Sequence, residues 1–362
     1  MQKTRWRFAP LTAFFVLLVA LATQRSLAQE YFDQYGLVTR SAALDLGGQP
    51  LGYPSGVISA VMQRDRILQA SLVKAGHPLK AHAFKRGADM VGLLGDHRLE
   101  AGLLGDMPTI LVACAGQVVI VGLVKQTTTS IVASGATQVL GLKGKRIGYI
   151  PVSSAHSTLL RGLASAGLTE TDVTLVPLGV DAMPGALARG EIDAFSAWEP
   201  ALSLALTQNE KNRVVYRGLS SDYFVIERDF ERRSPEAARQ LVAGFVRAIE
   251  WMRLSQKNLE TAARWVLSDG LVLTGQAAPT PLTQIMAITR RDILNVPSAP
   301  VILHNPGAAH PLKNEYQFLV EQGKVPPTAQ WDAVARAFQY DGLTRVLADA
   351  KAYKLRVFDY AD

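Results

Sequence analysis

The sequence predicts an α/β protein of two lobes, each a mostly parallel sheet flanked by helices, with a first lobe that is discontinuous in the chain. Two stretches, residues 42–108 and 142–200, alternate short apolar strands with helices in the order β-α-β-α-β. This alternation is typical of parallel strands joined by helical crossovers. A mature chain of about 330 residues is also long for one hydrophobic core, which favours two lobes.

The first stretch is expected to hold strands over 42–46, 79–84 and 101–104 and helices over 56–74 and 89–98. The turn Gly47-Gly-Gln-Pro50 follows its first strand, and Asp106 follows its third. The second stretch is expected to hold a strand that ends at Ile150, helices over 153–166 and 181–189, and strands over 173–176 and 192–197.

Two β-prone segments are expected to join the lobes. One covers 118–130 and leaves the first lobe, and the other covers 214–225, with a break after Tyr216, and returns to it. We therefore assign the lobes from these crossings: lobe 1 is 29–125 and 220–362, and lobe 2 is 126–219. Helices over 235–268, 280–294 and 312–322 are expected to buttress lobe 1.

Residues 151–156 break a strand and open a helix, which is a pattern that can bind an anion. The first N–H groups of a helix lack internal partners, and the helix dipole is positive there. Ser153, Ser154 and the amides near His156 are therefore expected to hold a small oxyanion without a buried cation. The alternative stays open, because serine is a favoured N-cap whatever the ligand and His156 can cover the helix end.

Each lobe is also expected to place one carboxylate after a strand, Asp106 in the first and Glu199 in the second. Ligands of open α/β sheets bind outside the strand ends, so both carboxylates are expected to face a shared crevice. Both also suit a helix start, because each lies close before a proline. The neighbouring Trp198 suits an ammonium group or an apolar tail, although core packing explains it equally well.

These groups favour a ligand with an oxyanion at the helix near Ser153 and a cationic or polar group facing Glu199. A bare inorganic anion would leave Asp106 and Glu199 unpaired near negative charge. An aminosulfonate-like solute therefore fits slightly better than nitrate.

The N-terminus predicts a cleaved secretory signal over residues 1–28. Three basic residues precede an apolar run over 8–22, and Ser26-Leu-Ala28 provides small residues for cleavage. We therefore expect a periplasmic protein. The chain has 38 basic and 31 acidic residues. Removal of the signal takes four basic residues and no acid, which leaves a net charge of +3 with no basic run, so nucleic acid is not an expected partner.

Several motifs in order resemble the second lobe of periplasmic solute-binding proteins of the nitrate/sulfonate/taurine ABC-importer type. They are Leu142-Lys-Gly-Lys-Arg, Ser153-Ser-Ala-His156, Leu187-Ala-Arg-Gly-Glu-Ile-Asp193 and Trp198-Glu-Pro200. The resemblance covers roughly residues 40–270. It implies the type II fold of these proteins, capture of a small organic anion or zwitterion by hinge closure, and a membrane permease as partner. It also implies that Gln49 and Pro50 contact the ligand, although an ordinary turn explains them equally well.

Enzymes occur on this fold, and a desulfinase-like hydrolase or a vitamin-precursor synthase is the alternative. Such enzymes use cysteine, and the single Cys114 lies in the apolar helix segment Leu111-Val-Ala-Cys-Ala, which indicates a buried small hydrophobe. No G-x-S-x-G context surrounds Ser153, and no histidine or cysteine cluster has metal-ligand spacing. We therefore expect a monomeric binding protein with no catalytic residue, metal or cofactor.

Overall fold

The structure is a computed structural model that describes residues 36–296, 299–300 and 311–361. The predicted signal over 1–28 lies outside the described residues. Eight strands form one sheet in the order β2-β1-β3-β8-β4-β7-β5-β6. Their bounds are β1 Leu44–Gly48, β2 Leu79–Ala83, β3 Ala101–Gly105, β4 Val118–Ser134, β5 Arg146–Tyr149, β6 Thr174–Pro177, β7 Ala194–Ala197 and β8 Asn212–Glu227.

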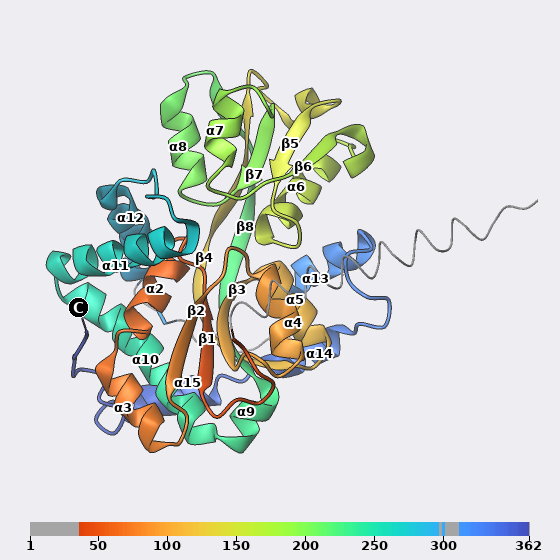
Figure 1. The fold of residues 1–362 in the computed structure, drawn as a ribbon. Helices are drawn as coiled ribbons and strands as arrows, with labels where there is room; N and C mark the ends of the chain where they lie inside the picture. Colours follow the sequence, from red (N-terminus) through yellow and green to blue (C-terminus); the bar gives the residue numbers. More distant parts are fainter. Residues whose placement is uncertain (1–35, 297–298, 301–310, 362) are drawn as a thin grey trace, which may run out of the picture.

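Two long antiparallel strands, β4 and β8, run through the middle of the molecule and connect its two halves (Figure 1). On one side β1 pairs in parallel with β2 and β3, and on the other β5 pairs in parallel with β6 and β7. The α/β class and the parallel pairing within each half are confirmed. The two sheets are continuous, however, because β4 and β8 pair from Val118 to Ser134 and carry the ladder across both halves.

Helices cover both faces of each half (Figure 1). In the larger half they are α2 Ser55–Met62, α3 Arg66–Lys74, α4 Ala88–Gly95, α5 Asp106–Cys114, α9 Arg228–Arg233, α10 Pro235–Leu254, α11 Gln256–Thr274, α12 Leu282–Thr289, α13 Pro311–Glu321, α14 Trp331–Ala337 and α15 Asp341–Ala348. In the smaller half they are α6 Ser154–Ser165, α7 Met183–Ala188 and α8 Ala201–Gln208. No helix among the described residues is long and apolar enough to cross a membrane.

The helix expected over 56–74 is two helices, because Asp65 starts a new one. Helix α2 ends at Met62, and the Asp65 side chain accepts the Leu68 N–H at 3.0 Å as the N-cap of α3. The fully buried Arg247 pairs with the same carboxylate, with 2.8 Å between Nε and Oδ2. A long-range partner of this kind has no local sequence signal.

Four buried apolar clusters divide between the two halves. Two lie on opposite faces of the larger half and draw on residues 37–124 and 223–355, and two lie in the smaller half and draw on residues 131–205. The packing therefore changes between residues 124 and 131 and again between 205 and 223. We propose that the boundaries between lobe 1 and lobe 2 lie within these intervals, as the crossings in the sequence predict.

The C-terminal helices also reach across to lobe 2. Arg161 on α6 pairs with Glu315 on α13, with 3.0 Å between Nε and Oε2, and its guanidinium lies over the Phe318 ring at 4.2 Å. Lys324 Nζ lies 2.6 Å from Glu170 Oε2. These contacts hold the lobes together on the side that α13 covers.

Candidate functional site

A small cavity lies between the lobes where the strand ends meet the crossing strands. It provides about 40 Å³. Lobe 1 contributes the loop after β1, the end of β3 and the start of α5, and lobe 2 contributes the loop before α6 and the residue after β7. The lining residues are Gln49, Gly52, Tyr53, Ser55, Arg86, Gly87, Gly105, Pro108, Lys125, Ile150, Val152, Ser153, Ser154, Trp198, Ser220 and Asp222.

Four of the eight residues expected to bind ligand line this cavity: Gln49, Ser153, Ser154 and Trp198. They come from both lobes, so the structure brings the two predicted halves of the site together. Gly52 lies against the indole, since a Cβ on Gly52 would be 3.5 Å from Trp198 Nε1. The lobes are therefore in contact around the cavity.

The two serines at the start of α6 direct their hydroxyl groups to protein atoms. Ser153 donates to the Ile150 carbonyl at 2.6 Å and accepts the His156 N–H at 3.2 Å, as an N-cap does. The Ser154 hydroxyl hydrogen-bonds the Asp106 carboxyl group. The first amides of α6 still lack intrahelical acceptors, so the helix start, more than its hydroxyl groups, offers donors to a ligand.

Gln49 is held by its amide nitrogen, which donates to the Leu103 carbonyl at 2.9 Å. This leaves the side-chain oxygen as an acceptor beside the cavity. The adjacent Pro50 turns away and lines a separate depression with Ser59 and Gln63. The turn after β1 therefore places one of its two predicted residues at the cavity.

Asp106 lies behind the cavity wall and is 5% exposed. Burial raises its pKa to about 7, the nearby Glu315 carboxylate adds to the rise, and hydrogen bonds from Ser154 and Met107 oppose it. It thus supports Ser154 and does not line this cavity, and it lines a second depression between the lobes with Arg161 and Glu315. The physical reason is that Asp106 is the first residue of α5 and bonds the Met107 N–H at 2.8 Å.

Glu199 also fails to reach the cavity. Its Oε1 accepts the Ser203 hydroxyl at 2.9 Å and its Oε2 accepts the Ser203 N–H at 3.2 Å, so it serves the start of α8. Arg291 lies 3.9 Å from the same carboxylate. The helix-start role that the following proline indicates accounts for this placement.

The His156 side chain does not line the cavity and lies against Glu170 and Tyr149. Its Nε2 lies 3.1 Å from Glu170 Oε1, and its ring packs edge-on against Tyr149 with centroids 4.9 Å apart. Burial lowers the pKa of His156, while the Glu170 carboxylate opposes that shift. Ligand roles for His156, Pro50, Asp106 and Glu199 therefore stay predictions that the cavity geometry does not support.

Sequence reasoning missed two charged residues on the crossing strands. Lys125 on β4 and Asp222 on β8 are register partners, and Nζ lies 3.5 Å from Oδ2. Ser55 donates a hydrogen bond to the same carboxylate. Lys125 is 6% exposed and lines the cavity, so a buried cation stands in the same cavity as the helix start that was expected to hold an oxyanion without one. The feature of the sequence that could have indicated Lys125 is its position as a single lysine directly after the apolar run Val118–Val124.

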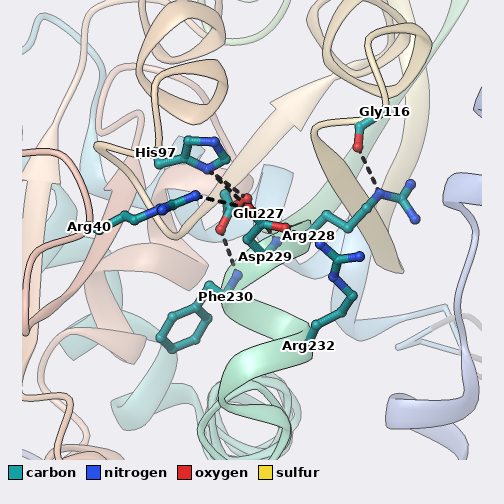
Figure 2. Close-up of polar contacts among 8 residues, drawn as sticks. All are labelled: Arg40, His97, Gly116, Glu227, Arg228, Asp229, Phe230 and Arg232. Carbon is teal, nitrogen blue, oxygen red and sulfur yellow. Dashed lines mark hydrogen bonds and ion pairs between the residues drawn. The ribbon is translucent and has the colours of Figure 1, made fainter.

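A cluster with metal-ligand residue types lies away from the cavity. His97, Glu227 and Asp229 bring ligand atoms within 4.8 Å of one another. The protein already satisfies these groups: Glu227 accepts two N–H groups at the start of α9, at 2.8 and 2.6 Å, and Asp229 pairs with Arg40 and Arg232 (Figure 2). A metal ion would have to displace two guanidinium groups, so we assign the cluster to capping α9.

Together the fold and the cavity between its lobes define a two-lobed binding-protein architecture. The model of the NMT1-like family matches residues 109–267. An Escherichia coli K12 protein provisionally named an aliphatic sulfonates-binding protein is 30% identical over 167 residues, which cover 44% of this chain and 51% of that protein. The taurine-binding periplasmic protein of the same organism is 25% identical over 279 residues, 71% of this chain and 81% of that one.

Solved structures show the same fold. The alkanesulfonate-binding protein of Xanthomonas axonopodis pv. citri bound to MOPS has a TM-score of 0.63 at 22% identity, over 83% of this chain and 99% of that one. The periplasmic nitrate-binding protein of Synechocystis PCC 6803 has a TM-score of 0.60 at 13% identity, over 87% and 91%. The structure of a desulfurization enzyme also matches, with a TM-score of 0.53 at 17% identity, over 85% of this chain and 99% of that one.

The match to the first two curated relatives spans about half of their length or less, 51% of one relative and 40% of the other. The resemblance to nitrate, sulfonate and taurine-binding proteins that the motifs predict is confirmed. This chain is similar to those proteins in sequence and in fold.

Proposed function

We propose that this protein is the solute-binding component of an ABC importer and captures a small organic anion or zwitterion by hinge closure. The observation that carries the proposal is a cavity lined from both lobes, with the strands β4 and β8 crossing beneath it. Only a closed arrangement of the lobes makes both sets of contacts, so a ligand in the cavity stabilises closure.

The lining favours a compact ligand with an oxyanion. Lys125, Arg86 and the first amides of α6 supply positive charge and donors, and Trp198 and Tyr53 supply apolar faces. The names of the relatives support sulfonates and taurine as the first compounds to test. Nitrate remains in the set because of the nitrate-binding structure.

Binding without catalysis is the favoured activity, although enzymes share the fold. Cys114 does not line the cavity, and burial raises the pKa of its thiol to about 11, which disfavours a nucleophilic thiolate. The cellular setting follows from the rest of the proposal: a periplasmic monomer, released from a signal peptide near Gln29, that delivers its ligand to a membrane permease and does not bind nucleic acid.

A thermal-shift screen of the mature protein tests this proposal. The panel contains taurine, ethanesulfonate, an aromatic carboxylate and nitrate. A true ligand at about 100 times its Kd stabilises the native state by about 2.7 kcal/mol, which raises Tm measurably. A panel without any stabilising compound, or a stabilising compound that the protein consumes, contradicts the proposal.

A further inference from the structure

We propose that Lys125 and Asp222 form a paired recognition element that selects a dipolar solute. In this arrangement Lys125 binds the oxyanion, and Asp222 binds an ammonium group on the same molecule. The inference rests on the proposed function and specifies its substrate class. It also replaces Glu199 as the expected partner of the cationic end, because Glu199 is occupied by Ser203.

The pair sits where a ligand and the hinge meet. Lys125 and Asp222 are opposite each other on the two strands that cross between the lobes, and both side chains line the cavity. Their exposed side-chain fractions are only 4% and 16%. Two charges this poorly solvated gain from any ligand that completes their hydrogen bonds.

Each partner keeps capacity for a ligand while the pair is formed. A lysine ammonium has three donors, and the 3.5 Å contact with Asp222 uses at most one. A carboxylate has about four acceptor positions, and Ser55 and Lys125 both approach Oδ2. Oδ1 of Asp222 and two N–H donors of Lys125 therefore remain for binding.

Charge balance in the cavity favours a ligand with both signs. Asp222 is the one carboxylate among the described residues that line the cavity, and it faces Lys125 and the positive start of α6, while Arg86 is already paired with Asp89. A bare anion satisfies the positive groups but approaches Asp222 with like charge. An ammonium a short chain away from the oxyanion removes that repulsion.

Matched ligand pairs test the inference by calorimetric titration of the mature protein. Taurine and ethanesulfonate share a sulfonate and a two-carbon chain and differ in the amine; β-alanine and propionate are the matching carboxylates. We expect the amine-bearing member of the better pair to bind at least about tenfold more tightly, because a charge-assisted hydrogen bond to a buried carboxylate is strong.

The variants assign this preference to the two residues. Asp222→Asn should reduce the ratio of the two affinities within the better pair to less than about threefold, mainly because the amine-bearing ligand binds less tightly. Lys125→Met should lower the affinity for both members of the pair by about tenfold or more. Glu236→Gln, which makes the same charge change at an exposed site on α10, should leave the ratio unchanged. Asp222→Ser is the alternative variant if Asp222→Asn does not fold, because it also removes the carboxylate, and it should reduce the affinity ratio in the same direction.

Equal or tighter binding of the ligand without the amine by the parent protein overturns this inference and leaves the proposed function intact. A ratio that survives Asp222→Asn also overturns it. If none of these four compounds, nitrate or the aromatic carboxylate binds, the proposed function fails together with it.

Discussion

Gly105 at the end of β3 lies directly against Ser154 at the start of α6, so lobe 1 and lobe 2 meet at these two residues. A Cβ built on Gly105 would come 2.5 Å from Ser154 Oγ but 3.8 Å from Ser154 Cβ. The Gly105 backbone has φ −65° and ψ 173°, which any residue adopts. The requirement for glycine here is therefore close approach between the lobes and not backbone strain.

Gly105→Ala should consequently hinder closure without harming the fold. We expect ligand affinity to fall about tenfold or more, because closure makes the contacts from both lobes, while the unfolding free energy of the free protein changes by less than about 1 kcal/mol. Calorimetry and denaturant titration measure the two effects. In a Ser154→Ala background the added methyl group has room, so Gly105→Ala should lower ligand affinity by less than about threefold. An equal loss of affinity in both backgrounds would refute a steric block at Ser154.

We expect Glu100 to make the stability of the protein depend on pH. It is 3% exposed, and burial raises its pKa from 4.5 to about 7, with the Asp45 and Glu227 carboxylates adding to the rise and the Asp45 N–H opposing it. A raised pKa means that the folded state binds the proton more tightly. The resulting stability is complete below about pH 4.5 and is lost as the pH rises through about 7.

Glu100→Gln keeps an acceptor for the Asp45 N–H, which Glu100 Oε2 binds at 2.8 Å, and removes the titration. Relative to this variant, the unfolding free energy of the parent should fall by up to about 3 kcal/mol between pH 4.5 and 8. Denaturant titrations of both proteins at several pH values measure the difference. Parallel pH profiles would show that Glu100 is not the titrating group.

Glu199→Gln separates a helix-start role from a ligand role. Because Glu199 bonds both the hydroxyl and the N–H of Ser203, the variant should lose up to about 1 kcal/mol of stability. Its affinity for taurine or the best ligand should change less than about twofold. A large change in affinity with unchanged stability would restore the ligand role that the sequence suggests.

Cys114→Ala tests the enzyme alternative. The thiol is partly buried against the apolar cluster under α5, so the expected cost is about 1 kcal/mol of stability with no change in ligand affinity. Incubation of the ligand with parent and variant, followed by mass spectrometry, checks for turnover. Consumption by the parent alone would favour a desulfinase-like enzyme.

The sequence predicts the fold class, the alternating elements and both crossings because these depend on local apolar periodicity. The crossing expected over 118–130 is β4, and the one expected over 214–225 is β8, although β8 continues through the break expected after Tyr216. The same local signals place Ser153, Ser154 and Trp198 at strand ends, where the cavity forms. Features that depend on residues close together in the chain could be predicted in this way.

Features that depend on distant partners could not. The pairing of the Asp65 cap with Arg247, 182 residues away, is one such feature. Asp106 and Glu199 satisfy both a ligand pattern and a helix-start pattern, and their contacts with Met107 and Ser203 show the helix-start role. Lys125 and Asp222 meet because β4 and β8 pair in a particular register, which neither segment specifies alone.

The most direct test of the account is a calorimetric titration of the mature protein with its best sulfonate, with the ligand recovered afterwards for mass spectrometry. We expect saturable binding with one ligand per chain and recovery of that ligand unchanged. Absence of binding to every sulfonate, taurine and nitrate, or conversion of the ligand to a product, would contradict it.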